Sequence, residues 1–467
     1  MEGHHYQLTI VGGGPGGYTT ALRGAALGLK TLLIEKDSIG GTCLNHGCIP
    51  TKVLTNTASI YQKIKKADEF GFTTGAVGFS FQKIQARKTA IVDQLTNGLQ
   101  KLLKGASVDI WYGDARTESP SRLAVKLHDG ATRHVTTDKL VLATGSEEIL
   151  PSLPGMALPG VITSWEALAL EDVPPKLSVI GGGVIALEMA SIFASFGSAV
   201  TIVHRSERLL RRMDLEMVRR LAIFLRRQGI EIKMNTPLQE IKEDGAGLLL
   251  TANTNSGTES MAADKVLLSI GRKACFGNLD LDALALDYSP QGIGVNEYME
   301  TNINGVYAVG DVTAPGYFLA HVATHQGLVA AQNAADQRAV FHGNVVPVCL
   351  FTNPELASAG LTEEGAKEKG YDVKVGKFPF SANGKAVTQG EADGLVKLVS
   401  DAANGVVLGV HILGPHASDL IQEGTLAVSQ GVKVSDLAGL IHPHPTLSEA
   451  VWEASLSITT GSALHFK

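Results

Sequence analysis

Short apolar runs alternate along this chain with segments that favour a helix. The predicted strand, helix and strand occupy residues 8–11, 18–27 and 30–34 in a first unit, and residues 177–180, 187–196 and 199–203 in a second. Strands that alternate with helices in this way are typical of βαβ units, which build a parallel sheet. We therefore expect an α/β protein that contains two such units.

The turn that follows the first strand of each unit carries three small residues at the spacing G-x-G-x-x-G/A. They are Gly12, Gly14 and Gly17 in the first unit, and Gly181, Gly183 and Ala186 in the second. Small residues at these places allow a tight turn, the approach of a pyrophosphate and close helix–strand packing, and the helix N-terminus favours phosphate. Glu35 ends the first unit where an acid would bind ribose hydroxyls. Both units are predicted to bind dinucleotides.

The second unit lacks the acid of the first. Glu35 follows its first glycine by 23 positions, and the residue at the same distance in the second unit is His204. The arginines that come after it are Arg205, Arg208, Arg211 and Arg212. A carboxylate would repel a 2′-phosphate, whereas arginines bind it as bidentate donors. The pattern predicts NADP rather than NAD, and the alternative is that these arginines form a solvated basic face.

Residues 40–52, with the sequence GGTCLNHGCIPTK, hold two cysteines five positions apart. On one helix such residues lie roughly 8–9 Å apart, but a disulfide needs Cα atoms within about 4.4–6.8 Å. Pro50 favours a first helical turn, so we expect a helix from near Cys48 through Lys52, with Cys43 in the preceding loop. A thiol at a helix N-terminus has a lowered pKa, and Lys52 shares its helix face. The segment predicts a redox-active disulfide. An ordinary stabilising disulfide is the alternative, but it would close too small a loop to gain much.

Composition narrows the class of protein. The length of 467 residues suggests about three domains. A net charge of −6 is too small to indicate nucleic acid or an anionic membrane as partner. No apolar run approaches the length of a membrane span, and the start of the chain lacks a signal-peptide pattern. Four cysteines in a chain of this size indicate an intracellular protein, which we expect to be cytoplasmic. No metal site is predicted.

Two dinucleotide units around a dithiol define an electron path. One cofactor brings hydride, a second accepts it, and the disulfide takes the electron pair. Flavin fits the middle role because it accepts hydride and reacts with thiolates. With these features the whole chain resembles the flavin-dependent pyridine-nucleotide disulfide oxidoreductases, and within them the lipoamide dehydrogenases.

The resemblance implies an α/β flavoprotein with two Rossmann-like domains, for FAD and NAD(P), and an α+β C-terminal dimerisation domain. The implied regions are an FAD domain at 1–146, an NAD(P) domain at 147–275, a central segment completing the FAD site at 276–344, and the dimerisation domain at 345–467. In the last of these, residues 347–360 and 409–414 are predicted to be rich in strands. The implied assembly is a homodimer.

The resemblance also assigns roles within the site. Cys43 is implied to be the interchange thiol that attacks the substrate disulfide, and Cys48 the thiol that faces the flavin. Lys52 is implied to lie near flavin N5 and to pair with Glu188. The further residues implied in cofactor binding are Thr42, Thr144, Gly145, Gly271, Gly310 and Asp311. Of these, Asp311 would bind the ribityl chain.

Near the C-terminus, residues 442–449 (HPHPTLSE) carry the family pattern H-P-T-x-x-E. Thiol–disulfide exchange needs a group that takes and returns a proton near neutral pH, and His444 suits this role. Glu449 can fix the tautomer of the ring and stabilise the imidazolium. In the family this histidine serves the other subunit, which implies an obligate homodimer. For the segment alone, the alternative is a histidine-rich loop closed by prolines.

Within the family, the sequence favours a lipoyl substrate. Leu22 stands where glutathione reductases have an arginine, and the C-terminal cysteine pair of mercuric reductases is absent. The implied reaction passes electrons between a lipoyl dithiol and NAD(P). The implied partner of the protein is a lipoyl-carrying protein or a small disulfide substrate. His204, Arg205 and Arg211 depart from ordinary lipoamide dehydrogenases and resemble the NADPH site of glutathione reductase. Two alternatives stay open: an NADPH-dependent reductase of another small disulfide, and a redox-sensing flavoprotein.

Overall fold

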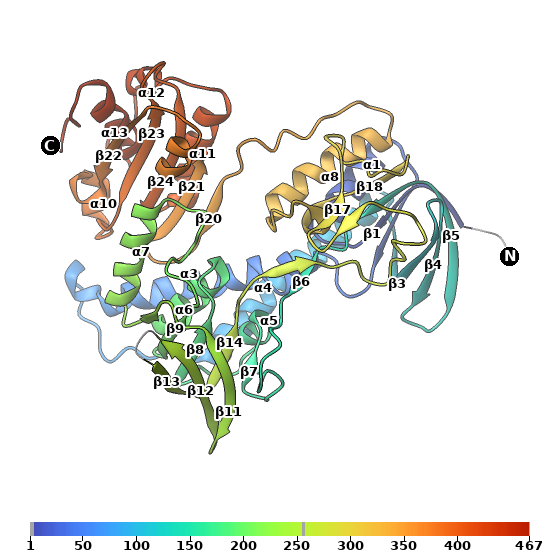
Figure 1. Ribbon diagram of the computed structural model, residues 1–467, viewed down its shortest axis with the longest axis horizontal. Helices are drawn as coiled ribbons and strands as arrows, with labels where there is room; N and C mark the ends of the chain where they lie inside the picture. The colour runs from blue at the N-terminus through green and yellow to red at the C-terminus, as the bar shows by residue number, and fades with distance from the viewer. Residues whose placement is uncertain (1–3, 255–256, 467) are drawn as a thin grey trace.

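The computed structural model of the chain describes residues 4–254 and 257–466. The prediction that the chain lacks a signal peptide was based on its first residues, and Met1–Gly3 lie outside the described residues. Figure 1 shows three lobes. The first lobe contains the N-terminal strands, the second lies below it, and the third is formed by the C-terminal part of the chain. Each lobe is built around its own sheet.

The sheet of the first lobe has the order β1-β2-β3-β4-β5-β18, with an additional pairing of β1 and β5. Its strands are β1 (His4–Val11), β2 (Thr31–Glu35), β3 (Asp109–Ser119), β4 (Arg122–Leu127), β5 (Thr132–Leu142) and β18 (Val306–Ala308). The strands β18, β5, β1, β2 and β3 run parallel in that spatial order, and β4 pairs antiparallel with β3 and β5. Helices α1 (Pro15–Ala26) and α8 (Ala320–Ala334) pack together beside this sheet (Figure 1). The predicted first βαβ unit is confirmed.

The second lobe contains a parallel sheet of order β10-β9-β8-β14-β7. Its strands are β7 (Val161–Ile162), β8 (Lys176–Ile180), β9 (Ala199–Val203), β10 (Glu231–Lys233) and β14 (Lys265–Leu268), and its helices are α5 (Ser164–Leu168), α6 (Val184–Ser195) and α7 (Leu215–Arg227). The second βαβ unit is therefore confirmed too. Both α1 and α6 begin three residues before their predicted starts, because the ends of the glycine turns already form the first helical turn.

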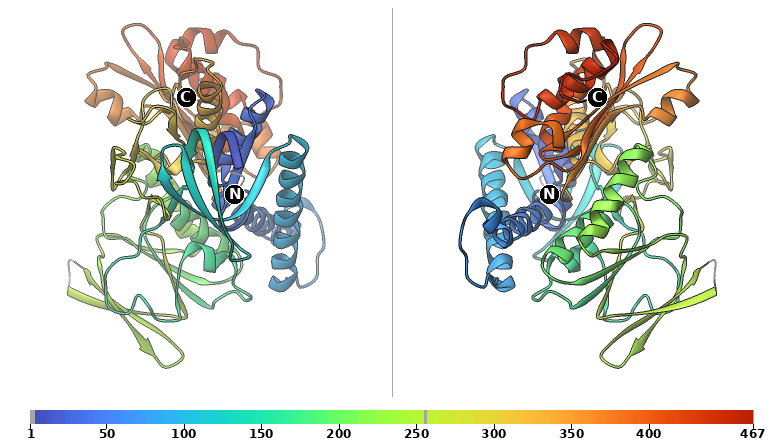
Figure 2. Two further views of the ribbon diagram at one scale, coloured as in Figure 1. Left: turned by 90° about the vertical axis from the view of Figure 1, so that its right-hand side faces the viewer. Right: turned by 90° about the vertical axis from the view of Figure 1, so that its left-hand side faces the viewer.

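An antiparallel three-stranded sheet, which the sequence did not predict, projects from the second lobe (Figure 2). It consists of β11 (Leu238–Asp244), β12 (Gly247–Thr254) and β13 (Gly257–Ala263). The chain enters the second lobe after β6 (Ser146–Glu148) and leaves it before β15 (Arg272–Ala274). These two strands pair antiparallel, so the second lobe is an insertion between β5 and β18 of the first.

Three helices lie between the sheets of the first two lobes. They are α2 (Gly41–Asn45), α3 (Cys48–Lys65) and α4 (Phe81–Gly105). Helix α3 contacts α2, α4 and α6. Shorter elements complete the first two lobes: η1 (Ala67–Phe70), β16 (Tyr288–Ser289), β17 (Gly292–Gly294), η2 (Gly310–Val312) and β19 (Thr313–Ala314).

The third lobe is an antiparallel sheet with helices, of order β20-β21-β24-β23-β22. We call it the C-terminal sheet: β20 (Val348–Leu350), β21 (Glu355–Gly360), β22 (Val373–Pro379), β23 (Leu395–Asp401) and β24 (Val407–Gly414). Its helices are α9 (Glu363–Glu368), α10 (Gly384–Thr388), α11 (Ala417–Ser429), α12 (Val434–Gly439) and α13 (Glu449–Thr459), with η3 (Phe380–Ala382). The central strands β23 and β24 are buried throughout. This is the expected α+β arrangement, with strands where residues 347–360 and 409–414 predicted them.

Within residues 4–254 and 257–466, no helix is both long enough and apolar enough to cross a lipid bilayer.

Candidate active site

The two cysteines of residues 40–52 lie on separate short turns of helix. Cys43 lies in α2 and Cys48 begins α3, with the break at Gly47. The predicted break and the start of a helix at Cys48 are confirmed, but the prediction of a loop around Cys43 is wrong. Gly40, with φ +102°, turns the chain into α2. The Asn45 amide then donates to the carbonyl of Gly41 at 3.0 Å and holds the turn closed.

The two sulfur atoms are neighbours. Both cysteines are free thiols, and a hydrogen bond from Cys43 lowers the pKa of Cys48 to about 7, with a further contribution from the Lys52 cation. The same hydrogen bond, together with burial, raises the pKa of Cys43. At neutral pH the negative charge of the pair therefore resides on Cys48, at the N-terminus of α3.

Lys52 joins α3 to the second lobe. Its Nζ lies 3.1 Å from Oε2 of Glu188, a residue of α6 that is 4% exposed, so the expected contact between these two side chains is present. The backbone N–H of Phe351 donates to Oε1 of Glu188 at 2.9 Å. The Lys52 ammonium also lies 4.1 Å from the centroid of the Phe351 ring. All three lobes thus contribute to the surroundings of the redox pair.

His444 and Glu449 form a hydrogen-bonded pair on the third lobe. The Nδ1 atom of His444 donates to Oε1 of Glu449 at 2.8 Å, and the histidine side chain is 79% exposed. Burial works against ionisation of Glu449, but hydrogen bonds from the Thr446 N–H and from His444 hold its pKa below the usual value. Nδ1 is engaged, which leaves Nε2 as the nitrogen that can exchange a proton. Among the described residues, no hydrogen bond or ion pair joins this pair to Cys43 or Cys48.

The first glycine turn is shaped for a phosphate. A Cβ on Gly12 would lie 2.2 Å from the Ala143 carbonyl oxygen, and one on Gly17 would lie 1.8 Å from the Gly12 carbonyl oxygen. Gly14, in contrast, has only the Cα of Gly41 within 4.0 Å, which leaves room in front of the N-terminus of α1. Such a cradle fits the pyrophosphate of a dinucleotide.

At the end of β2, Glu35 is folded back onto this turn. Its Oε2 accepts from the Gly13 N–H at 2.6 Å, and its Oε1 accepts from the Asp37 N–H at 2.8 Å. Burial raises the pKa of Glu35.

Asp311 lies close to the antiparallel pair of strands β6 and β15, which connects the first two lobes. Its Oδ2 accepts from Ser146 Oγ at 2.7 Å, and Arg272 Nε donates to the same Ser146 Oγ at 2.8 Å. Burial raises the pKa of Asp311, because this single hydrogen bond does not replace full solvation. A partly buried carboxylate with free acceptor positions fits the hydroxyl groups of a ribityl chain.

The remaining predicted FAD residues surround Asp311 and the redox pair. Thr144 Oγ1 donates to the Cys275 carbonyl at 2.6 Å, and the Gly145 carbonyl accepts from the Cys275 N–H at 3.0 Å. Gly310, with φ +77°, donates its N–H to Gln326 Oε1 at 2.7 Å. Thr42 lies in α2 next to Cys43. These residues fit the binding of FAD between the first glycine turn and α2.

The second glycine turn repeats the first. A Cβ on Gly181 would lie 2.0 Å from the Ser269 carbonyl oxygen, and Gly183 has no neighbour within 4 Å. The third small position is the buried Ala186 in α6. Gly271, with φ +137°, lies where the chain leaves the second lobe, and its carbonyl accepts from the Ile149 N–H. The open space at Gly183, in front of α6, fits a second pyrophosphate.

His204 takes the place of Glu35 in the second unit. Its Nε2 donates to the Arg208 carbonyl at 3.1 Å, and its Nδ1 would lie 2.8 Å from a Cβ on Gly182. Burial lowers the pKa of His204, and the nearby Arg205 and Arg211 lower it further. The ring is therefore neutral near pH 7 and does not repel a phosphate group as a carboxylate would.

Arg205 and Arg211 lie at the surface around His204. Both are exposed, and within the described parts of the chain no ion pair engages either guanidinium group. Arg208 differs, since its guanidinium donates to the Met213 carbonyl and braces the loop. Arg205 and Arg211 are thus free to bind an anion, and this arrangement fits a 2′-phosphate.

Sequence reasoning missed several polar partners of the site. Phe351, Ser146, Arg272 and Gln326 are contributed by segments far from the motifs they support. Nothing in their local sequence distinguishes them, because each is brought to the site only by the packing of the lobes. Leu22, the position considered for glutathione binding, packs against an apolar cluster of the first lobe.

Comparisons with known proteins agree with this geometry. The pyridine nucleotide-disulphide oxidoreductase family matches residues 6–327, and the dimerisation domain of the same family matches residues 346–455. The chain is 39% identical to a dihydrolipoyl dehydrogenase of Bacillus subtilis over 99% of both chains. It is 42% identical to a dihydrolipoyl dehydrogenase of Thermus scotoductus over 96% of both. A solved structure of an HOCl-induced flavoprotein disulfide reductase, RclA from Escherichia coli, superimposes with a TM-score of 0.87 at 27% identity, covering 96% of this chain and 99% of the other.

Proposed function

Because the chain belongs to the pyridine nucleotide-disulphide oxidoreductase family, we propose that it is an FAD-dependent dihydrolipoyl dehydrogenase. It oxidises a dihydrolipoyl group to the lipoyl disulfide and reduces NAD(P)⁺ to NAD(P)H with release of a proton, or runs this reaction in reverse. One observation carries the proposal: Cys43 in α2 is paired with Cys48 at the start of α3, and Cys48 is poised as a thiolate near Lys52. The names and identities of the relatives support the choice of a lipoyl substrate.

Cys43 is the group that exchanges with the substrate. In the oxidised protein the two cysteines form a disulfide, and a dihydrolipoyl thiolate attacks the sulfur of Cys43. The Cys43–Cys48 bond breaks, and Cys48 leaves as a thiolate, the role for which its pKa of about 7 suits it. The second lipoyl thiol then attacks the mixed disulfide, which releases lipoyl disulfide and the Cys43 thiol. When bound, FAD supplies a two-electron acceptor between this dithiol and the nicotinamide.

Lys52 and Glu188 set the charge around the pair. The Lys52 ammonium favours the Cys48 thiolate, and Glu188 orients the ammonium from the second lobe. Thr42, Asp311 and the first glycine turn hold FAD, and the second glycine turn holds the nicotinamide dinucleotide.

His444 takes the proton of the attacking lipoyl thiol and returns it to Cys43. Glu449 holds the ring through Nδ1, so that Nε2 faces the substrate. The histidine is exposed and has no polar contact with the cysteines of its own chain within residues 4–254 and 257–466. It therefore serves the site of the second subunit in a homodimer, and the dimerisation domain supports this assembly.

For the nicotinamide we propose a preference for NADP(H). The free Arg205 and Arg211 beside a neutral His204 support it.

Steady-state kinetics of the purified, FAD-loaded protein test both parts of the proposal. Lipoamide and glutathione disulfide are each assayed against NADH and NADPH. We expect the largest kcat/KM for lipoamide with NADPH. A larger kcat/KM for glutathione disulfide than for lipoamide would contradict the substrate, and a colourless protein would contradict the whole assignment.

A second candidate is an NADPH-dependent reductase of another small disulfide. The NADP-type loop at Arg205 and Arg211 favours it, and the similarity to a flavoprotein disulfide reductase of Escherichia coli is consistent with it. In the third alternative, a redox-sensing flavoprotein, the His444–Glu449 pair would have no function. Rapid turnover with any disulfide would exclude it.

A further inference from the structure

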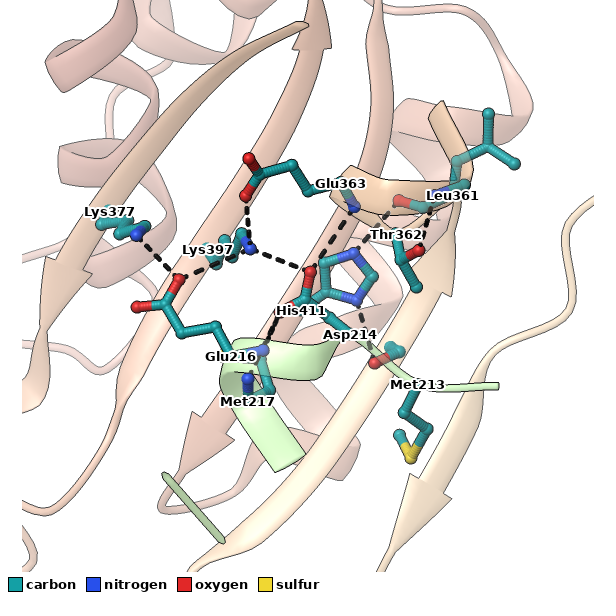
Figure 3. Close-up of polar contacts among 12 residues, drawn as sticks. Met213, Asp214, Glu216, Met217, Leu361, Thr362, Glu363, Lys377, Lys397 and His411 are labelled. Carbon is teal, nitrogen blue, oxygen red and sulfur yellow. Dashed lines mark hydrogen bonds and ion pairs between the residues drawn. The ribbon is translucent and has the colours of Figure 1, made fainter. Parts of the chain in front are cut away.

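A lysine is buried where the second lobe meets the C-terminal sheet (Figure 3). Lys397 in β23 is 1% exposed, and its Nζ contacts Asp214 Oδ2 at 2.9 Å, Glu363 Oε2 at 2.8 Å and Glu216 Oε2 at 3.4 Å. We call these four residues the Lys397 cluster. Asp214, the N-cap of α7, and Glu216 in the first turn of α7 belong to the second lobe. Lys397 and Glu363 belong to the third. The cluster is therefore an ionic contact between lobes.

Every charge of the Lys397 cluster is compensated. Lys377 Nζ lies 2.7 Å from Glu216 Oε2, and Lys367 Nζ lies 2.6 Å from Glu363 Oε1. Burying charges costs free energy even when they are paired, and apolar side chains of similar size would often stabilise such a contact equally well. What distinguishes a lysine held by three carboxylates is that it fixes the relative position of the elements that carry them.

A neutral histidine packs beside the cluster on β24. His411 is fully buried, its Nε2 donates to the Leu361 carbonyl at 3.1 Å, and its Nδ1 accepts from Ser358 Oγ at 3.0 Å. Burial lowers the pKa of His411. It adds no charge near pH 7, so Lys397 is the cation that meets Asp214.

Asp214 connects the cluster to α7. Its Oδ1 caps the helix by accepting from the N–H groups of Glu216 at 3.1 Å and Met217 at 3.3 Å. Its Oδ2 binds Lys397. Asp214 is fully buried, and Figure 3 shows it between the start of α7 and the C-terminal sheet.

Asp214 directly follows residues 204–213. We call this segment the nucleotide loop, and it carries Arg205 and Arg211. Backbone hydrogen bonds also hold this loop to its own lobe. At the second glycine turn, the Leu210 N–H donates to the Gly182 carbonyl at 2.9 Å, and just after β10, the Asn235 N–H donates to the Ser206 carbonyl at 3.1 Å. The loop is therefore held to its own lobe by backbone hydrogen bonds and to the C-terminal sheet by the Lys397 cluster.

We propose that Lys397 and Asp214 are positioning residues for the nicotinamide dinucleotide, because they hold the nucleotide loop at the place from which Arg205 and Arg211 reach the ligand. The inference rests on the proposed function, which gives the second glycine turn its ligand. It makes the C-terminal sheet, and not only the second lobe, a determinant of nucleotide binding.

The test is the variant Lys397→Met in the FAD-loaded protein. Titration calorimetry with NADP⁺ and with NAD⁺ gives the dissociation constants without turnover. We expect the dissociation constant for the preferred nucleotide to rise about 2- to 30-fold, the usual range for residues that act through a neighbouring element. The ratio of the constants for the two nucleotides should approach one. The rate of flavin reduction by dihydrolipoamide in a single turnover should stay at the wild-type value, since it does not use this loop.

Lys367→Met is the matched control. It removes a lysine from the other oxygen of Glu363 but leaves Asp214 and Lys397 paired, so nucleotide binding should not change. If Lys397→Met does not fold, the double variant Asp214→Asn with Lys397→Met removes both buried charges and keeps an N-cap residue. The same rise in the dissociation constant is expected of it.

The outcomes separate the two proposals. A wild-type protein that binds neither nucleotide would overturn the proposed function and this inference with it. A wild-type protein that binds one of them, with unchanged affinity in the folded Lys397 variants, would overturn the inference alone. A general loss of thermal stability without a change in nucleotide affinity would assign the cluster a structural role only, and would equally overturn it.

Discussion

The two βαβ units share one backbone arrangement, but the residues at and after the end of the second strand differ. In the first, Glu35 folds back onto the glycine turn and accepts the Gly13 N–H at 2.6 Å. In the second, His204 stands at the same place over Gly182, and its ring holds the start of an arginine-bearing loop. The first unit is thus completed by its own residues, whereas the loop of the second unit is anchored on another lobe through Asp214 and Lys397. A repeated motif predicts the common ligand class, and the residues after the second strand determine how each copy is specialised.

The units also differ at the third small position. Gly17 would place a Cβ 1.8 Å from a backbone oxygen of its own turn, whereas the second unit accommodates the methyl group of Ala186. The first turn is therefore packed more tightly onto its helix than the second.

The largest expected effect breaks the first unit at this position. In Gly17→Ala, the new methyl group would collide with the Gly12 carbonyl, so the turn must open and FAD should be lost. The ratio of flavin to protein absorbance after purification measures this directly. The matched change in the second unit, Ala186→Gly, should keep FAD at wild-type occupancy and cost only about 1 kcal/mol of helix stability. Stoichiometric FAD in Gly17→Ala would show that the two turns are equivalent after all.

The next effect concerns nucleotide choice. Combining His204→Glu with Arg205→Ser and Arg211→Ser should make the second unit resemble the first and reverse the preference from NADPH to NADH. A charge-assisted hydrogen bond contributes about 1.5–3 kcal/mol, or roughly 10- to 150-fold per arginine, and solvent screening at these exposed side chains places the effect near the lower bound. The ratio of kcat/KM values for the two nucleotides is the measurement. If the wild-type protein already uses NADH tenfold better than NADPH, the arginines form only a solvated face.

A smaller effect is expected at the redox pair, which joins the two units through Lys52 and Glu188. Alkylation of the reduced protein at Cys48 should rise with pH around a midpoint of about 7, because only the thiolate reacts. In Cys43→Ala the hydrogen bond is lost, and the midpoint should move up toward the usual thiol value. Peptide mass spectrometry after brief alkylation at several pH values separates the sites.

Cys349 provides an internal control for that measurement. Burial raises its pKa to about 11, so it should stay almost unreacted over the same pH range. An equal rate at Cys349 and Cys48 would argue against a thiolate stabilised at the start of α3.

The smallest expected effect is a difference in acid sensitivity. Burial raises the pKa values of Glu35 and Asp311 in the first lobe, so the cost of ionising them in the folded state disappears as the pH falls. Burial opposes ionisation of Asp214 and Glu216, but their neighbours hold both pKa values below normal. His411 and the hydrogen bond from Lys397 act on Asp214, and Lys377 and Lys397 act on Glu216. The stabilising contribution of these two acids is complete above the unfolded pKa and is lost as the pH falls through the folded one.

Acid should therefore loosen α7 before α1. Hydrogen exchange of the two helices, compared between pH 7 and pH 4 after correction for intrinsic rates, tests this order. Lys397→Met should reduce the difference, since it removes the main cation of the cluster. Equal loosening of both helices in the wild-type protein would contradict the ionic anchoring of the second unit.

The sequence predicted what depends on local patterns. The βαβ units, the glycine turns and the helix start at Cys48 follow from short-range signals, and each was found in its place. The helix around Cys43 was missed because it has only five residues and depends on the left-handed conformation of Gly40. Polar partners such as Phe351 could not be predicted, because they reach the site through the packing of separate lobes.

The sequence around Lys397 does contain a signal for a buried ionic cluster. Lys397 interrupts a strand, residues 395–401, in which every residue is buried. A lysine at such a position requires buried acids on a neighbouring element. The identity of those acids, at the start of α7, still depends on how the second and third lobes dock.

The pairing of β5 with β18 has a consequence for synthesis of the chain on the ribosome. The edge of β5 that β18 covers stays open until residues 306–308 have emerged, although the other strands of that sheet precede residue 143. The inserted second lobe, by contrast, has all its strands once residue 268 is made. Domains fold as units once their segments are available, so the second lobe is expected to fold first and the first lobe to close around it. Until then, the unpaired edge of β5 can pair with strands of other chains, which exposes the nascent protein to aggregation.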